Sequence, residues 1–225
     1  MSDQDEENNT IVGEAEGPFA GMGRIERIMR ALEITKGVQI ARRYLAMNAF
    51  DGALTMLGLI LGGLITINPL NPMPGFTAIL VAAAGTSIAM AISGFSGSYL
   101  AESAERDREV EEMGKAMLSD MSETMYAHAS RTTSVVVAVV DGLSPAGAAL
   151  IIITPLWFVP GGYLAYNIAF YMAIIICFAL LFVLGMFLGT VSRRNMYIYG
   201  AKTLLAGLAT AALMLLISIL TGGNI

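Results

Sequence analysis

Long apolar segments alternate with short polar ones along most of this chain. A helix that crosses the ~30 Å hydrocarbon core of a bilayer needs about 20 apolar residues. Segments of that length lie at 44–66, 76–100, 132–155, 163–190 and 197–221. The connections after the first and third segments are uncharged and contain Pro, Gly and Asn residues, which is typical of turns. The pattern therefore predicts an all-α polytopic membrane protein with five transmembrane helices.

Composition and charge agree with this interpretation and add an orientation. The chain is 56% hydrophobic and 14% charged with a mean hydropathy of +0.67, which excludes a soluble globular fold. All 13 Lys and Arg residues lie before the first span, within 101–131, or near the junction of the last two spans. The positive-inside rule assigns these segments to the cytoplasm. We expect the N-terminus inside, Ile225 outside and, in a prokaryote, a plasma-membrane location.

The polar segments divide the rest of the chain. Residues 1–23 are acidic and poor in apolar side chains, so we expect a disordered tail. Residues 24–43 place Ile25, Ile28 and Met29 at helical spacing among arginines, which predicts an amphipathic helix on the inner leaflet. A surface helix packed on the protein is the alternative. Residues 44–100 and 132–225 then form the transmembrane domain, and 101–131 a helical hairpin that extends into the cytoplasm between the second and third spans.

Two aspartates fall inside predicted spans. An ionisable group at membrane depth costs roughly 2.5–3.5 kcal/mol, so such residues often mark ion or proton paths. Pro145 lacks an N–H and so leaves the carbonyl of Asp141 without its helical donor, beside the Asp141 carboxylate. A hydrogen bond between helices is the alternative role for either aspartate. The candidate ion pathway consists of Asp51, Thr55, Thr86, Met90, Ser93 and Asp141.

The 101–131 hairpin is the candidate metal site. In a continuous helix Glu102, Glu105, Glu109 and Glu112 lie within a sector of about 80°, and such stacked carboxylates repel unless a cation neutralises them. Carboxylates with thioethers and an imidazole suit Fe²⁺ or Mn²⁺. The candidate metal ligands are Glu102, Glu105, Glu109, Glu112, Met113, Met117, Glu123 and His128. The alternative is a solvated face neutralised by Arg106, Arg108 and Lys115. No resident cofactor is expected beyond a bound or transported metal.

Three segments carry a resemblance to a known family. They are FDGALTMLGLILG at 50–62, SYLAESAERDREVEEM at 98–113 and YGAKTLLAGLATAALMLLISIL at 199–220. From about Ala49 onward the chain resembles the vacuolar iron transporters of plants and yeast and their prokaryotic relatives. The resemblance implies a homodimer that exports Fe²⁺ or Mn²⁺ from the cytosol, usually against protons, between the two first spans. It also implies that Asp51 is the intramembrane carboxylate, and that Glu102, Glu105 and Glu109 or Glu112 bind metal.

The spacing of small residues bears on the dimer. Gly58 and Gly62 in the first span, and Gly185 and Gly189 in the fourth, have the small-xxx-small spacing that allows close helix approach. We expect the Gly58 face, which is next to Asp51, to form the two-fold interface.

Two other function classes stay open. The second span ends SGFSGSYLA at 93–101, without the Met and Glu typical of vacuolar iron transporters, so a non-transporting scaffold or lipid-handling protein is one alternative. Gly94-Phe95-Ser96-Gly97 has the form of an intramembrane protease motif. However, the only histidine, His128, lies in the connector, and a serine nucleophile needs a base within hydrogen-bond reach. We therefore expect no enzymatic activity.

Overall fold

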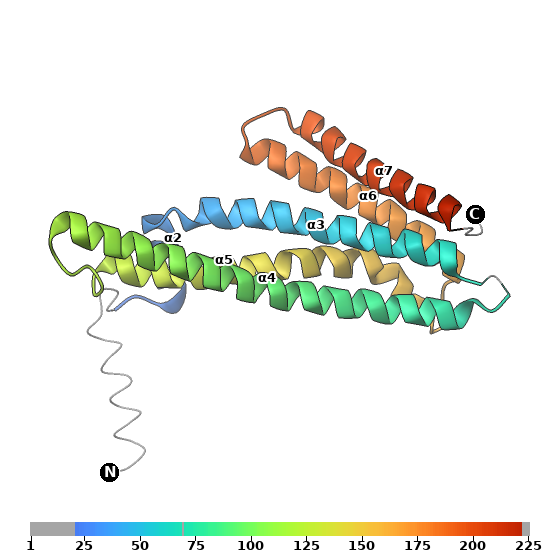
Figure 1. Cartoon of the computed structure of the whole chain (residues 1–225), viewed down its shortest axis with the longest axis horizontal. Helices are drawn as coiled ribbons and strands as arrows, with labels where there is room; N and C mark the ends of the chain where they lie inside the picture. Colours follow the sequence, from blue (N-terminus) through green and yellow to red (C-terminus); the bar gives the residue numbers. More distant parts are fainter. Residues whose placement is uncertain (1–20, 69, 222–225) are drawn as a thin grey trace, which may run out of the picture. The chain divides into compact units, whose positions relative to one another are not determined.

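The structure, a computed structural model, describes residues 21–68 and 70–221. Within these ranges it is helical and contains no strand (Figure 1). The elements are α2 (Arg24–Ile34), α3 (Gly37–Thr66), α4 (Pro72–Met117), α5 (Met125–Ile153), the short 3₁₀ helix η1 (Thr154–Phe158), α6 (Tyr166–Val191) and α7 (Met196–Leu220). Five helices are long and apolar enough to cross a membrane, which confirms the predicted integral membrane class. The acidic tail predicted for 1–23 lies almost wholly outside the described residues.

The helix boundaries differ from the predicted ones mainly at the N-terminal side. The helix expected over 24–43 is interrupted: α2 ends at Ile34, Lys36 adopts a φ of 54°, and α3 begins at Gly37. The first spanning helix begins at Gly37, seven residues before the predicted residue 44. Its first turns are polar, so the apolar pattern alone did not include them. By contrast, α4 continues unbroken to Met117, as the predicted helical extension of the second span requires.

The chain forms two compact units. Among the described residues, unit 1 comprises 21–41 and 97–139, and unit 2 comprises 42–68, 70–96 and 140–221. Within unit 1, α2 and the start of α3 pack on α5 through small side chains. The hydroxyls of Thr35 and Thr133 lie 2.7 Å apart, and a Cβ on Gly37 would approach the Thr133 methyl to 2.6 Å. Ala31 is fully buried at this contact, while Ile25 and Met29 on the same helix are exposed.

Unit 2 contains the apolar core. Met56, Leu57 and Ile60 of α3 are fully buried, together with side chains from α5, η1 and α6. Phe76 of α4 meets Phe170 of α6 edge to face, with ring centroids 5.9 Å apart. In water, burial of each such side chain stabilises the folded state by roughly 1.5–3 kcal/mol. In a bilayer, close van der Waals contact between helices stabilises their association instead.

Glycines set the helix crossings of unit 2. A Cβ on Gly52 of α3 would lie 2.5 Å from the carbonyl oxygen of Pro145, and one on Gly142 of α5 would lie 2.5 Å from the carbonyl oxygen of Ala91. Gly94 faces the Cα of Gly142 across the second of these crossings. Both Asp-Gly pairs of the sequence thus place their glycine where two backbones touch.

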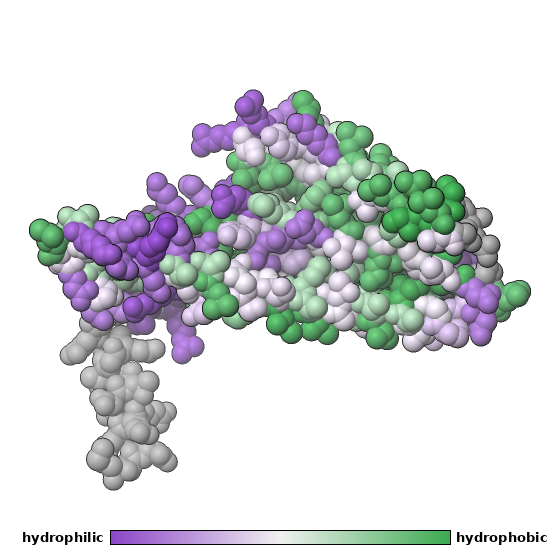
Figure 2. Space-filling model, viewed as in Figure 1, coloured by the Kyte–Doolittle hydropathy of each residue, from purple (hydrophilic) through white to green (hydrophobic). Residues whose placement is uncertain are grey.

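Helices α6 and α7 lie side by side as an antiparallel pair (Figure 1). Gly185 and Gly189 of α6 face the backbone of α7 at Tyr199 and Met196, and the hydroxyl of Thr203 donates to the Leu181 carbonyl at 2.8 Å. The small-xxx-small motif of the fourth span is therefore used inside the chain. The outward side of α7 carries exposed leucines, and apolar residues predominate on this part of the surface (Figure 2).

Candidate metal and ion sites

The predicted glutamates of α4 are already paired with arginines of the same helix. Arg106 lies between Glu102 and Glu109, with N–O distances of 3.6 and 3.9 Å. Arg108 lies 2.8 Å from Glu105 and 3.7 Å from Glu112. These spacings of three and four residues are those at which helix side chains meet. The helix thus supplies its own counter-charges, which is the alternative that the sequence left open.

The two arginines differ in burial. The Arg106 side chain is only 6% exposed and that of Glu102 only 14%, whereas Arg108 and its partners are more than half exposed. The hydroxyl of Tyr126, on α5, also donates to Glu109 at 3.2 Å. Exposed pairs contribute about 0–1 kcal/mol, but removing one partner of a buried pair leaves an uncompensated charge. Arg106 is therefore the structural centre of this face.

The other predicted metal ligands do not converge on one point. His128 Nε2 is 3.6 Å from Glu123, and the exposed Met117 ends α4. Across residues 21–68 and 70–221, no three His, Cys, Asp or Glu side chains converge in a way that could hold a metal ion. The metal assignment of these eight residues stays a prediction. Within one chain, Arg106 and Arg108 supply the positive charge next to the four α4 glutamates.

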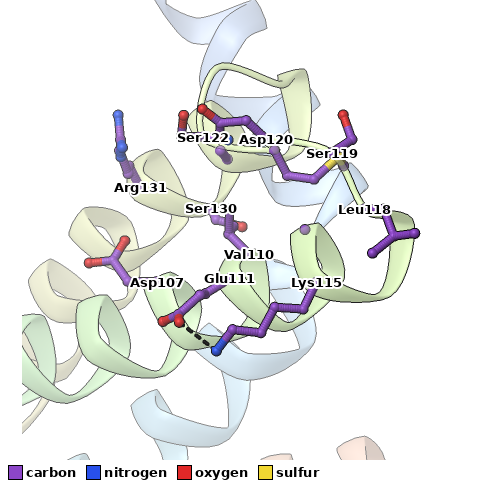
Figure 3. Close-up of a pocket in the computed structure, with 13 residues that line it drawn as sticks. Asp107, Val110, Glu111, Lys115, Leu118, Ser119, Asp120, Ser122, Ser130 and Arg131 are labelled. Atoms are coloured by element: carbon purple, nitrogen blue, oxygen red, sulfur yellow. Dashed lines mark hydrogen bonds and ion pairs between the residues drawn. The ribbon is translucent and has the colours of Figure 1, made fainter.

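A cavity of about 590 Å³ opens on the face of α4 that carries Asp107 and Glu111 (Figure 3). It is lined by the end of α4, the following turn and the start of α5, and includes Asp107, Glu111, Lys115, Asp120, Ser130 and Arg131. None of the predicted metal ligands lines it. Around the end of α4 the lining residues 107, 111, 114 and 118 have helical spacing, which was the available sequence signal. The part of the wall formed by the turn could not be predicted from that spacing.

Several charges of this cavity are satisfied locally. Lys115 Nζ lies 2.6 Å from Glu111, and this hydrogen bond and charge lower the pKa of Glu111 and raise that of Lys115. The backbone N–H of Ser122 donates to Asp120 at 2.9 Å and lowers the pKa of that carboxyl. Ser130 is buried, and its hydroxyl has no hydrogen-bond partner among the described residues. The cavity is thus lined by charges of both signs and by apolar side chains, without the concentrated negative charge that a divalent cation requires.

The candidate ion pathway is split between exposed and buried positions of unit 2. Asp51 and Thr55 lie on an exposed face of α3, and the Thr55 hydroxyl donates to the Asp51 carbonyl at 2.8 Å. Asp141 is buried, at 7% exposure, beside the Gly94–Gly142 crossing. The structure therefore does not place the two aspartates in one shared environment.

The remaining pathway residues follow α4. Thr86 and Met90 are half-buried and Ser93 is exposed. Met90 packs against the apolar core, which is the packing role that a thioether in a span most often has. Gly58, one turn beyond Thr55, has open space where a Cβ would stand. Asp51, Thr55 and Gly58 thus form one uncovered stripe on α3.

Comparison with known proteins gives one relative. The chain is 30% identical over 201 residues to the "Uncharacterized protein MJ0645" of Methanocaldococcus jannaschii, an alignment that covers 87% of this chain and 98% of that protein. No family model matches the sequence, and no solved structure does so either.

Proposed function

Because the chain belongs to the same family as this M. jannaschii protein, whose name assigns no activity, we propose its function from its own residues. The protein is a divalent transition-metal transporter, which exports Fe²⁺ or Mn²⁺ from the cytosol in exchange for protons. The N-terminus and the 101–131 hairpin face the cytoplasm and the C-terminus faces outside, in accordance with the distribution of Lys and Arg.

The observation that carries this proposal is the exposed carboxylate of Asp51. Within the described residues, the Asp51 side chain has no hydrogen-bond or ion-pair partner, although it lies in an apolar spanning helix. A charged group so placed is costly and is characteristic of ion and proton paths. A carboxylate can hold either a proton or part of the charge of a metal ion, which is the exchange that an antiporter needs.

A second copy of the chain would cover this carboxylate. The Asp51, Thr55 and Gly58 stripe is small, polar and open, so two α3 helices can approach closely along it. Two-fold symmetry is the commonest closed arrangement and places the same residues on both sides. The dimer thereby brings two carboxylates and their neighbouring oxygens to one axis, which suits a divalent cation better than a single carboxylate does.

The α4 glutamates collect metal on the cytoplasmic side in this proposal. A divalent ion has to compete with Arg106 and Arg108 for Glu102, Glu105, Glu109 and Glu112. The thioethers of Met113 and Met117 and the imidazole of His128 are the softer donors that favour Fe²⁺ or Mn²⁺ over Mg²⁺, and Glu123 adds a carboxylate oxygen.

The dimer prediction can be tested by crosslinking. In a Cys177→Ala background, Gly58→Cys should form a disulfide between two copies in the membrane, because the Gly58 position is open and lies on the proposed axis. Gly85→Cys on α4 is the matched control, since Gly85 is equally open but lies on another helix. Equal crosslinking at both positions, measured on non-reducing gels, would contradict an α3 interface.

The metal-collecting face can be tested by thermal stabilisation. Replacement of Glu102, Glu105, Glu109 and Glu112 by Gln should abolish the rise in melting temperature on addition of Mn²⁺, which measures preferential binding to the folded state. The exposed double variant Glu105→Gln/Glu112→Gln leaves the buried Arg106 pairs intact and should lose part of the rise. Asp107→Asn/Glu111→Gln, on the cavity side, should keep it. An unchanged Mn²⁺ response in the quadruple variant refutes the site.

A membrane scaffold or lipid-handling protein of the same fold is the second candidate. The pairing of the α4 glutamates with arginines favours it, since a scaffold helix needs no metal to neutralise these charges. Mn²⁺ binding to the full chain separates the two, because a scaffold has no reason to bind the ion at micromolar concentration.

A further inference from the structure

A groove on unit 2 combines apolar walls with a single lysine. It has a volume of about 310 Å³ and is formed by α3, α6 and α7. Met47 and Phe50 of α3 and Leu184 and Leu188 of α6 supply the apolar walls, and Lys202 of α7 lies on its border. This volume is at the lower end of the range of about 300–1,000 Å³ that is usual for ligand sites. The groove is thus large enough for part of an elongated apolar ligand.

Lys202 is the charged group that this groove presents. Its ammonium lies 5.2 Å from the ring centroid of Tyr199, and among the described residues no carboxylate is within ion-pair distance of it. Thr203, also in the lining, already donates its hydroxyl to the Leu181 carbonyl. A ligand therefore meets one cation that is held by an aromatic ring and is not neutralised by a carboxylate of the described chain.

The charge balance around the groove is positive. Residues 142–225 contain Arg193, Arg194 and Lys202 but no Asp or Glu. On α3, Arg42 and Arg43 precede the groove residue Ala46 by about one turn. Asp51, which follows the groove residue Phe50, is the nearest acidic residue in sequence, so these five bases outweigh the acidic charge of the neighbouring sequence.

We propose that this groove binds an anionic phospholipid, with an acyl chain along Met47, Phe50, Leu184 and Leu188 and the phosphate on Lys202. Basic pockets between spanning helices on the cytoplasmic side are characteristic sites for anionic head groups. The aliphatic stem of a lysine can lie along apolar walls while its ammonium reaches the head-group level. This proposal uses neither Asp51 nor the α4 glutamates, although Met47 lies one turn before Asp51 on α3.

Native mass spectrometry of the full chain in a neutral detergent tests the site. The wild-type protein should retain phosphatidylglycerol at least about fivefold more than phosphatidylcholine of the same chain length, and Lys202→Gln should lose that preference. Met47→Trp fills the groove without a change of charge, so it should reduce retention of phosphatidylglycerol as well. Lys36→Gln removes the same charge from unit 1 and is the matched control, which should behave as the wild type.

Each other result contradicts the proposal. Equal phosphatidylglycerol retention by Lys202→Gln and the wild type removes the head-group contact. Full retention of phosphatidylglycerol by Met47→Trp contradicts binding of the acyl chain along the groove. If Lys202→Gln fails to fold, Met47→Trp alone decides the test. Stabilisation by inorganic phosphate as large as that by phosphatidylglycerol, lost in Lys202→Gln, makes the site an anion site and overturns lipid binding.

Discussion

Asp51→Asn should fold and insert like the wild type but should transport Mn²⁺ at least about tenfold more slowly, a loss that corresponds to about 1.4 kcal/mol. Asparagine keeps the size of the side chain and its hydrogen-bonding capacity but can carry neither the negative charge nor the exchanged proton. Asp51 lies on the exposed side of α3, so the substitution disturbs no buried contact of the described chain. Uptake of Mn²⁺ into proteoliposomes with an imposed pH gradient is the measurement.

The same chemical change in the charged end of α4 is the control for this experiment. Asp107→Asn removes an exposed carboxylate of α4 that belongs to neither predicted set, so it should transport at the wild-type rate. A wild-type rate in Asp51→Asn would exclude the proposed role of that carboxylate. Absence of Mn²⁺ transport in the wild-type protein itself would favour the scaffold alternative.

Gly142→Ala should lower the melting temperature in detergent by on the order of 5 °C or more. The added methyl group would stand 2.5 Å from the Ala91 carbonyl oxygen and 2.9 Å from the Phe95 nitrogen. Both are backbone atoms, which cannot rotate away as a side chain can, so α4 and α5 have to separate. Overpacking of this kind typically costs about 1–3 kcal/mol. Thermal unfolding at a fixed scan rate measures the effect.

Gly147→Ala on the same helix separates this clash from the general effect of replacing glycine. Nothing lies within 4 Å of a Cβ at Gly147, and alanine in a helix interior is favoured over glycine by up to about 1 kcal/mol. This variant should be as stable as the wild type or slightly more so. Equal melting temperatures for the two variants would mean that the α4–α5 contact at Gly142 is not tight in the folded protein.

Helix identity was predictable from the sequence because long apolar runs have few other stable forms in a membrane. The unbroken course of α4 to Met117 was also predictable, since the segment after the second span contains no Pro and its one Gly lies near the end. The break at Lys36 was not, because residues 24–43 contain no proline and only Gly37 as a weak signal. Three non-glycine residues of the described chain adopt the left-handed conformation, and all three lie at helix ends: Lys36, Leu118 and Arg193.

Helical periodicity placed the four α4 glutamates on one face, and the sequence left open whether a metal or arginines neutralise them. Periodicity places Arg106 within reach of Glu102 and Glu109, yet the burial of its guanidinium depends on tertiary packing, to which α5 also contributes Tyr126. The groove between α3, α6 and α7 was missed for the same reason. Met47, Leu188 and Lys202 are far apart in the chain, and no local pattern marks them as neighbours.

The four-residue turn between α6 and α7 has a consequence for how the protein is made. Residues 192–195 form a short connection that keeps the ends of α6 and α7 close together. Gly185 and Gly189 bring the two helices into direct contact. We expect the pair to leave the translocon as one hairpin, because α6 alone would expose a glycine groove to lipid. By the positive-inside rule, Arg193 and Arg194 in that turn favour its placement on the cytoplasmic side. We therefore expect these two arginines to orient the last two spans together during synthesis, so that a change at either one acts on both.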